Sequence, residues 1–392
     1  MRMKISVVAT TNTKQFATKE DFENFSGHAA GICYMKDNFS TIEQEDVEKT
    51  KRRIAQTKNS GHHSVYDHEM VSLYLEDIPK ALAMVLNNEQ MYTTSEKSAR
   101  YTKMVPTEAE QKLYDKWLQI FKNKITEAYG NKGLKFFEGN KIEKLAQENA
   151  RYLLSVFTPT SMMYTVSYRQ LNYLYGFLKQ EIERENQNAL YTALKPAMED
   201  LCEAIENLDY FDETLTQNGK LRTLSLVTPS SRIFVPTYGD TYTAIYKGSF
   251  AQYAQAQRHR TLNYTMQLLE KPEFYVPPIL KDDADLMQEW VKDCNQQAET
   301  FPQGMLVQFV ERGTLENFIL KLMERKCSCA QLEINQQVNQ TLKEYAQALE
   351  EQGHPMAEEL KKYTKGARCT FPGYTCSTPC GFAEGINETR KI

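Results

Sequence analysis

The sequence has no excess of basic residues and no long apolar run, and these two absences exclude several classes of function. Its 392 residues include 47 Lys and Arg against 51 Asp and Glu, which gives a formal net charge of -4. A protein that binds nucleic acid or an anionic membrane through its overall charge would carry a basic surplus. No apolar run approaches membrane-spanning length, and the apolar part of residues 1–9 is too short for a signal peptide. We therefore predict a cytoplasmic protein with no nucleic-acid and no membrane partner.

Cysteine is sparse over most of the chain and concentrated near its end. Of eight cysteines, five belong to this last part: Cys327, Cys329, Cys369, Cys376 and Cys380. In a cytosolic chain this clustering indicates a metal site or reduced thiols more than a disulfide framework. Three of the thiolates after residue 365 could bind zinc, with Cys327 or Cys329 as a fourth ligand, although the spacing is not that of a standard zinc pair. Free thiols in an ordered tail are the alternative.

The composition predicts two domains with a substantial core. Hydrophobic residues make up 41% of the chain and charged residues 25%, as in ordinary globular proteins. Between Leu208 and Lys220 the sequence turns polar, and Asn218-Gly219 is a turn signal. We place the domain boundary there, which gives an N-terminal half of residues 1–215 and a C-terminal half of residues 216–392.

Both halves are predicted to contain, in this order, a strand, a residue that ends the strand, a helix and a polar segment. Alternating apolar and polar residues predict a half-buried strand over 71–75, and Pro79 precedes a helix over 80–91. The same order recurs about 170 residues later, where a strand over 241–246 is followed by a helix that Ser249 can cap. This recurrence indicates an internal duplication.

The second helix is predicted to end in Arg258, His259 and Arg260. The arginines can present forked donors to a phosphate or a polar ring, and His259 can stack or donate. The alternative is a solvated helix end whose cations complement the helix dipole. At the corresponding place the first half has Asn88-Glu89-Gln90, which carries no cation.

The first half has a different set of polar residues. Ser98 and Arg100 could together clamp a phosphate, and Glu96 could accept a hydrogen bond from a base or ribose. A plain polar connection between helices is the equal alternative. The segment His62–His68 concentrates histidines beside a carboxylate, and its spacing fits hydrogen bonding to a ligand better than metal binding.

Two further arginines stand in apolar or aromatic surroundings. Arg151 follows Glu148-Asn149-Ala150, and Arg169 lies within Ser167-Tyr168-Arg169-Gln170. A buried arginine needs a partner. Each of the two therefore pairs with a local carboxylate or faces a ligand.

Together these segments resemble the flavin-dependent thymidylate synthases, whose signature is Arg-His-Arg followed by Ser-x-Arg-Tyr. Here the signature is split, because the first half has Ser98–Tyr101 and the second has Arg258–Arg260. Gly61–His68 resembles the family's Gly-His-x-Ser/Thr-x-Phe-Glu-His, and Ala150-Arg151 resembles its Ala-Arg-x-x-Leu-Pro. Tyr168-Arg169 resembles a later Ala-Arg of the family.

The second half carries the remaining resemblance. Arg325 followed by Ala330–Ile334 looks like the family's Arg-x(4)-Ala-Gln-Trp-Glu-Ile, and Asn317-Phe318 precedes it. The resemblance implies an α+β fold made of two tandem copies of the family fold, each an antiparallel sheet packed with long helices. It also implies a homodimer that mimics the family homotetramer. Because Asn88-Glu89-Gln90 lacks the cations, we expect at most half the sites of a true tetramer.

The activity that the resemblance implies is methylation of dUMP to dTMP, with FAD as cofactor and methylenetetrahydrofolate and NADPH as co-substrates. The implied nucleotide contacts are Gln255, Glu96, Ser98, Arg100, Tyr101 and Arg151. The implied flavin contacts are Arg258, His259, Arg260, Asn317 and His62. The implied catalytic residues are Arg325, which would polarise the uracil, Arg100 and His62. The alternatives are a pyrimidine nucleotide hydroxymethylase and a non-catalytic nucleotide-binding relative, because each half lacks one motif.

Overall fold

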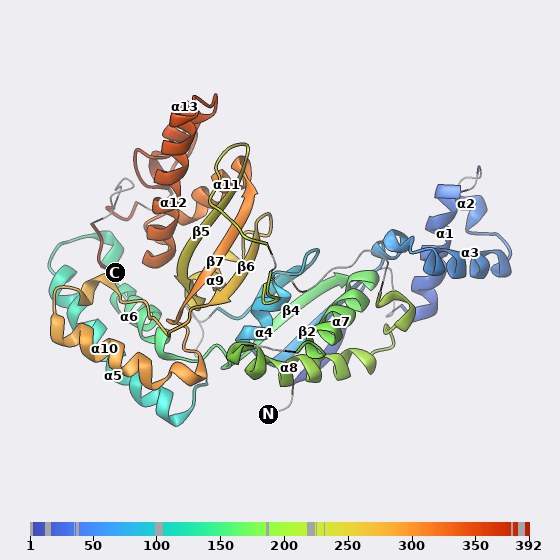
Figure 1. Ribbon diagram of the computed structural model, residues 1–392, viewed down its shortest axis with the longest axis horizontal. Coiled ribbons are helices and arrows are strands. Elements are labelled where there is room, and N and C mark those ends of the chain that lie inside the picture. Colours follow the sequence, from blue (N-terminus) through green and yellow to red (C-terminus); the bar gives the residue numbers. More distant parts are fainter. Residues whose placement is uncertain are drawn as a thin grey trace. The chain divides into compact units, whose positions relative to one another are not determined.

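A computed structural model describes most of the chain (Figure 1). The described residues are 3–11, 17–34, 36, 39–98, 105–185, 188–217, 224, 226–230, 232–377, 379–382 and 389–392. Arg100 and Tyr101 of the predicted phosphate loop lie outside them. Within the described part, no helix is long and apolar enough to cross a membrane.

The chain divides into two compact units, and the division interrupts the predicted N-terminal half. The first unit comprises Met1–Lys97 and Pro159–Thr228, and the second comprises Ser98–Thr158 and Pro229–Ile392. The segment that contains Arg151 therefore belongs to the second unit, although the predicted boundary at residue 215 grouped it with the first half.

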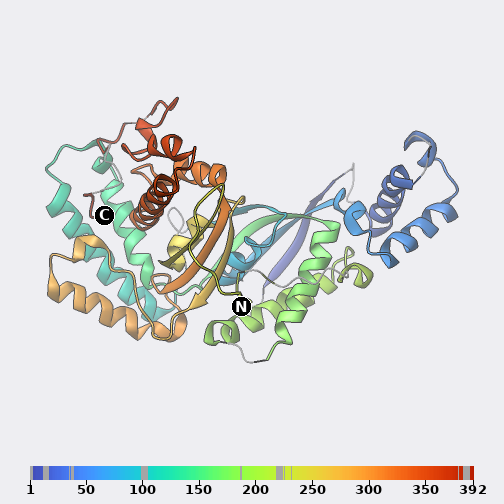
Figure 2. The ribbon, with the colours of Figure 1, turned by 45° about the horizontal axis from the view of Figure 1, so that its top comes forward.

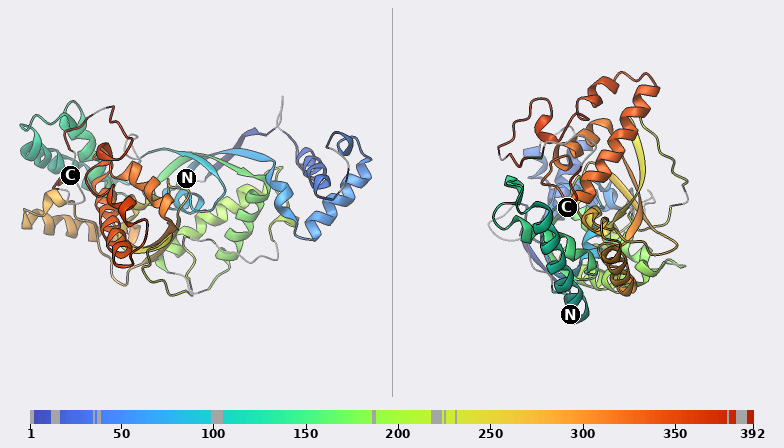
Figure 3. Two further views of the ribbon diagram at one scale, coloured as in Figure 1. Left: turned by 90° about the horizontal axis from the view of Figure 1, so that it is seen from above. Right: turned by 90° about the vertical axis from the view of Figure 1, so that its left-hand side faces the viewer.

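The first unit contains a four-stranded antiparallel sheet in the order β1-β2-β4-β3. Its strands are β1 (Lys4–Thr10), β2 (Met70–Pro79), β3 (Thr93–Glu96) and β4 (Pro159–Ser167). Its helices are α1 (Lys19–Tyr34), α2 (Phe39–Ile42), α3 (Val47–Asn59), α4 (Lys80–Leu86), α7 (Tyr168–Ile182) and α8 (Ala189–Glu206). Helices α1, α2 and α3 form a separate helical group, while α7 and α8 pack along each other beside the sheet (Figure 3).

The second unit contains a three-stranded antiparallel sheet in the order β5-β7-β6. Its strands are β5 (Thr241–Ser249), β6 (Asn263–Leu268) and β7 (Leu306–Thr314). Its helices are α5 (Glu108–Tyr129), α6 (Lys141–Ala150), α9 (Phe250–Ala256), α10 (Ala284–Gln296), α11 (Leu315–Arg325), α12 (Leu332–Glu351) and α13 (Ala357–Lys361). Helices α5 and α10 lie side by side (Figure 2), and Trp117 Nε1 donates to Asp293 Oδ2 between them at 2.8 Å.

The two units share a local order of elements. In each, the first predicted strand runs directly into a seven-residue helix whose residues are all buried, α4 after β2 and α9 after β5. In the first unit β4 lies between β2 and β3, and in the second unit β7 lies between β5 and β6. Each of these central strands, β4 and β7, runs directly into a capped helix. Ser167 caps α7 and Thr314 caps α11. The strands predicted over 71–75 and 241–246 are thus confirmed.

Both predicted helices are shorter than expected. The helix predicted over 80–91 ends at Leu86, where Asn87 closes the last turn through its backbone N–H. The helix predicted to end in Arg258–Arg260 ends at Ala256, because Gln257 closes it and the chain then turns toward β6. Arg258, His259 and Arg260 therefore lie in a turn, where neighbouring side chains point in different directions.

Candidate functional site

The turn after α9 separates the three side chains of the Arg-His-Arg segment. Ser249 caps α9 by accepting from the backbone N–H of Gln252 at 3.0 Å, as its sequence position predicted. His259 is buried, whereas Arg258 and Arg260 are exposed. The two arginines can therefore meet an anionic ligand from solvent, while His259 acts inside the protein.

His259 is held by Arg325, the last residue of α11. Arg325 Nε donates to His259 Nε2 at 2.8 Å, and Arg325 Nη2 donates to the backbone oxygen of Gln255 at 3.0 Å. Because Nε2 accepts this bond, the neutral imidazole carries its proton on Nδ1. Burial, together with the nearby Arg325 and Lys321 charges, lowers the pKa of His259 to about 2. Glu324 lies 4.0 Å from Nε2, but a neutral imidazole forms no ion pair with it.

We expect His259 to remain uncharged between about pH 5 and 8, where a free histidine with a pKa of about 6.5 would titrate. Because its folded-state pKa is lowered, its contribution to stability is present above about pH 6.5 and is lost as the pH falls toward the folded value. Nitrogen-15 NMR, with the signal assigned by comparison with His259→Gln, should show an Nδ1-protonated ring with no titration. A ring that titrates near its ordinary pKa would contradict this geometry.

The amide of Gln331 joins residues from three distant segments. Its Oε1 accepts from Arg151 Nη2 at 2.9 Å and from Gln255 Nε2. Its Nε2 donates to the hydroxyl of Tyr152, which in turn donates to Glu333 Oε2 at 2.8 Å. Arg151, Gln255 and the start of α12 are thereby fixed relative to one another inside the second unit.

Glu333 ties this network to the N-terminus of α9. Its carboxylate accepts from the backbone N–H of Ser249 at 2.8 Å and from Ser249 Oγ at 2.6 Å. Burial raises the pKa of Glu333, and it raises the pKa of Tyr152 as well. A contiguous network therefore runs from Glu333 to Gln255, whose backbone oxygen also binds Arg325. The sequence named Arg151 and Gln255 as site residues, but the role of Gln331 in joining them was missed, although Gln331 lies in the Ala330–Ile334 motif.

Two buried amide oxygens next to this network lack a partner. The Oε1 atoms of Gln255 and Gln257 make no hydrogen bond within the described part of the chain. Both side chains are buried, so solvent does not satisfy them readily. An uncompensated buried acceptor is a place for a ligand N–H group. Together with the exposed Arg258 and Arg260, the cluster offers acceptors for an imide N–H and cations for phosphates.

Asn317 holds the same turn from the other side. It lies in the first turn of α11, and its Nδ2 donates to the backbone oxygen of Thr261 at 3.2 Å. The contact fixes the chain just after Arg260. Asn317 therefore stabilises the turn that carries the predicted flavin residues Arg258, His259 and Arg260.

The predicted residues of the first unit are placed differently. Glu96 accepts from Lys80 Nζ at 2.7 Å and from Asn87 Nδ2 at 3.2 Å, so both of its carboxylate oxygens are already engaged. His62 precedes a short helix and is half-buried, whereas the neighbouring His63 is buried. Ser98 is among the described residues, whereas Arg100, its partner in the predicted phosphate clamp, lies outside them.

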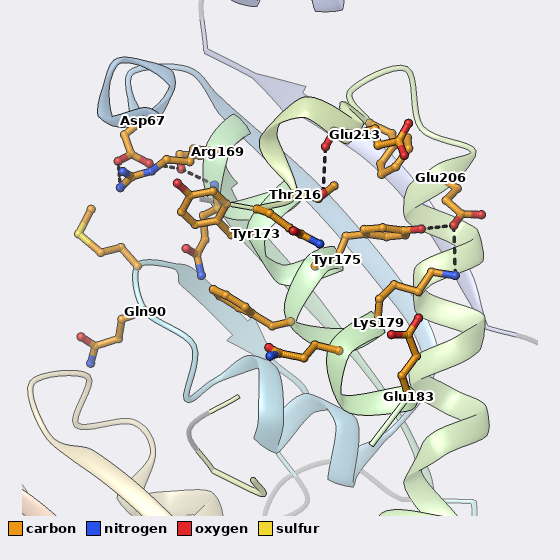
Figure 4. Close-up of a pocket in the computed structure, with 18 residues that line it drawn as sticks. Asp67, Gln90, Arg169, Tyr173, Tyr175, Lys179, Glu183, Glu206, Glu213 and Thr216 are labelled. Atoms are coloured by element: carbon orange, nitrogen blue, oxygen red, sulfur yellow. Dashed lines mark hydrogen bonds and ion pairs between the residues drawn. The ribbon is translucent and has the colours of Figure 1, made fainter. Parts of the chain in front are cut away.

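A cavity of about 980 Å³ in the first unit contains a residue set that sequence reasoning identified only in part (Figure 4). Arg169 lines it, forms an ion pair with Asp67, and lies 5.4 Å above the ring of Tyr173. Ser167 Oγ donates to Asp67 at 2.6 Å. Arg169 therefore pairs with a carboxylate, as the first alternative predicted, and the same side chain lines a cavity.

The cavity extends to α8, where Glu206 lines it. Tyr175 donates to Glu206, and Lys179 lies 3.4 Å from the same carboxylate (Figure 4). Gln90 belongs to the segment that stands in place of Arg-His-Arg, and it lines this cavity. Gln90 and Arg169 line the same cavity although they are distant in sequence, and no local sequence signal indicates this.

The clustered cysteines do not assemble a metal site. The thiol of Cys327 accepts a hydrogen bond from Cys329, which lowers the pKa of Cys327 to about 6. The described residues include no group of three or more His, Cys, Asp or Glu side chains placed to hold a metal ion. The zinc prediction for Cys327, Cys329, Cys369, Cys376 and Cys380 therefore receives no support.

Part of the chain matches a known protein family and two curated proteins. Residues 16–200 match the sequence model of a family described as thymidylate synthase complementing protein. The flavin-dependent thymidylate synthase of Thermococcus onnurineus is 23% identical over 150 residues, which are 35% of this chain and 56% of that protein. The enzyme of the same name from Pyrococcus furiosus is 22% identical over 152 residues, 36% of this chain and 57% of that protein. The chain thus spans little more than half the length of these relatives.

Two solved structures that hold pyrimidine nucleotides align with about half of this chain. Thymidylate synthase X from Helicobacter pylori with FAD and dUMP is 16% identical, with a TM-score of 0.33 over 55% of this chain and 100% of that one. The UMP/dUMP methylase PolB from Streptomyces cacaoi, bound with 5-Br dUMP, is 12% identical, with a TM-score of 0.32 over 53% and 97%. The match over residues 16–200 and the two curated relatives support the family to which the motifs point, the flavin-dependent thymidylate synthases.

Proposed function

We propose that this protein is a flavin-dependent enzyme that methylates dUMP to dTMP, with FAD as cofactor and methylenetetrahydrofolate and NADPH as co-substrates. The observation that carries the proposal is the buried cluster of the second unit, in which Arg151 and Gln255 meet on Gln331 while Arg325 binds His259 and Gln255. The family match and the curated relatives support the reaction class.

The residues present fit a flavin and a pyrimidine nucleotide. The exposed Arg258 and Arg260 suit phosphate oxygens, because guanidinium groups bind them with two parallel hydrogen bonds. The unpartnered Oε1 atoms of Gln255 and Gln257 suit the imide N–H of a uracil or an isoalloxazine. When bound, reduced flavin supplies the hydride that completes the methyl group.

The residues of this chain orient and polarise the substrate. Hydrogen bonds to His259 Nε2 and to the backbone oxygen of Gln255 fix the Arg325 guanidinium, which is the proposed donor to a uracil carbonyl oxygen, where negative charge develops during attack on the ring. Because His259 is neutral, it accepts a hydrogen bond from Arg325 and does not repel the guanidinium charge. Arg151 is the proposed phosphate ligand, held in place by Gln331. No cysteine takes part in this scheme.

We also propose that the chain arose by duplication and that it works as a homodimer. The shared order of strand, buried seven-residue helix and capped helix in the two units supports this history. Counted from the first residue of α4 and of α9, Asn88-Glu89-Gln90 stands at the place of Arg258-His259-Arg260. Only the second copy therefore has the cations that would bind a flavin phosphate.

A flavin titration tests this proposal first. The purified protein should bind FAD, with a shift in the flavin absorbance bands, and Arg258→Ala should weaken binding at least about tenfold because it removes a charge-assisted hydrogen bond from an exposed position. Arg52→Ala, which removes an exposed arginine of α3, is the matched control and should leave the affinity unchanged. A colourless protein that also fails to bind added FAD would exclude the flavin enzyme.

A further inference from the structure

Strand β5 lies at the edge of its sheet. On the side that faces away from β7, its backbone groups form hydrogen bonds at two places. Backbone N–H and C=O groups of one residue point to the same side of a strand, and the side alternates from residue to residue. Thr243 exchanges two 2.9 Å hydrogen bonds with Thr237, so its groups point away from β7. Ser249 points its N–H the same way, toward Glu333 Oε1 at 2.8 Å.

Ile245 and Lys247 lie between these two positions and share their direction. The register of β5 against β7 is continuous over Thr241–Ser249, so no bulge reverses the alternation. Among the residues that the structure describes, none hydrogen-bonds to the backbone N–H or C=O groups of Ile245 and Lys247. The sheet edge therefore has a short gap, closed at one end by the Thr237–Thr243 pair and at the other by Glu333.

A cavity of about 300 Å³ lies along this gap, between β5 and α12. Gln252 of α9 lines the cavity and is fully buried, and its Oε1 has no partner in the described part of the chain. A β-carbon at residue 248 would lie only 2.8 Å from this oxygen, so Gly248 keeps the space open. We call this site the edge groove, and its principal residues are Ile245, Lys247, Gly248, Gln252, Glu333, Gln337 and Glu344.

The equivalent edge of the first unit is filled by a strand of this chain. β2 also runs straight into a buried seven-residue helix, and β1 pairs antiparallel with its outer edge. The stretch of β2 that pairs with β1 ends at Glu76, and a bulge between Leu75 and Ile78 separates it from α4. Leu75 pairs with Ile5 of β1. The edge groove is thus the position that β1 occupies in the other unit.

We propose that the edge groove binds a short extended peptide segment that carries a basic side chain and that adds to β5 as a further antiparallel strand. Peptide strands bind open sheet edges through main-chain hydrogen bonds, and side-chain pockets give the specificity. Gln252 Oε1 supplies a buried acceptor beside the strand. The exposed carboxylate of Glu344 lines the groove, while the Lys247 ammonium is engaged by Glu273 at 2.8 Å, so the lining favours a cation.

The test uses a fluorescein-labelled peptide with the sequence of β1, Lys4–Thr10, and measures fluorescence anisotropy with the full-length protein. We expect Ile245→Pro to weaken binding at least tenfold, because proline removes an N–H that faces the groove and no hydrogen bond of the β5–β7 ladder. Ile245→Val is the matched control and should bind as the wild type does. A peptide with Lys4 replaced by Glu should bind at least threefold more weakly.

Gln252→Leu gives a second readout that leaves the backbone edge intact, and we expect it too to weaken the peptide at least threefold. Thermal unfolding of both variants establishes that they fold. No binding by the wild-type protein, or equal binding by wild type, Ile245→Pro and Gln252→Leu, would overturn the proposal. So would sedimentation that shows a dimer lost in Ile245→Pro, since a second copy of the chain would then occupy the edge.

Discussion

Arg325→Ala is expected to lower kcat for dUMP methylation by about a hundredfold or more, because removal of one preorganised donor to developing negative charge costs a factor of this order. Arg325 is the last residue of α11, where it donates two hydrogen bonds and its Nη2 lies 3.3 Å from the exposed Glu324 carboxylate. The substitution also leaves His259 Nε2 and the Gln255 oxygen without their donor. Steady-state kinetics at saturating FAD measures the effect.

Arg325→Lys separates geometry from charge. A lysine retains the cation, but a single ammonium cannot reproduce the planar fork that reaches His259 Nε2 and the Gln255 oxygen together. We expect kcat to remain reduced at least about tenfold, with unfolding by denaturant close to that of the wild type. If Arg325→Ala retains activity within about threefold of wild type, Arg325 does not polarise the substrate.

Lys321→Met is expected to destabilise the protein by about 3–5 kcal/mol, the usual cost of removing one partner of a buried ion pair. Lys321 Nζ lies 2.6 Å from Glu311 Oε2, and both side chains are completely buried. The hydroxyls of Tyr242 and Tyr246 donate to the same carboxylate at 2.7 and 2.8 Å. Without the ammonium, the Glu311 charge is left in the core with only neutral donors.

Two further variants show whether the destabilisation comes from the lost charge or from lost packing. Lys321→Met combined with Glu311→Gln removes both charges and should recover part of the lost stability. Lys51→Met, which breaks an exposed pair with Glu48, should change the unfolding free energy by less than about 1 kcal/mol. Urea unfolding monitored by circular dichroism measures all three. Equal destabilisation by the single and double variants would show that packing, and not charge, dominates at this site.

The pair also matters for the site, since Lys321 lies one helical turn before Arg325 on α11. A loosened α11 would release Arg325 from His259. Lys321→Met should therefore also bind dUMP more weakly than the wild type does at temperatures near its unfolding transition.

Local features of the fold could be predicted from the sequence. The period-two alternation predicted strands that fall within β2 and β5, and Ser249 caps α9 as its position before a small-residue helix indicated. These features depend on neighbouring residues alone. The helix ends did not follow as readily, because Gln257 closes α9 before the Arg-His-Arg segment and the turn then buries only His259.

Long-range features could not be predicted in this way. The assignment of residues 98–158 to the second unit depends on contacts such as Arg151 with Gln331, between residues distant in sequence. The Asp67–Arg169 pair likewise joins the end of a short 3-10 helix to the start of α7, far apart in sequence. The motifs named the residues, but only tertiary structure shows which of them meet.

The most direct measurement is release of tritium from dUMP labelled at carbon 5, catalysed by the full-length protein with FAD, NADPH and methylenetetrahydrofolate. The proposed activity requires the proton at this carbon to leave as the methyl group forms, so tritium release should match dTMP formation and should be lost in Arg258→Ala and Arg325→Ala. Flavin-loaded protein that releases no tritium, or that yields a hydroxymethylated nucleotide in place of dTMP, would contradict the proposal.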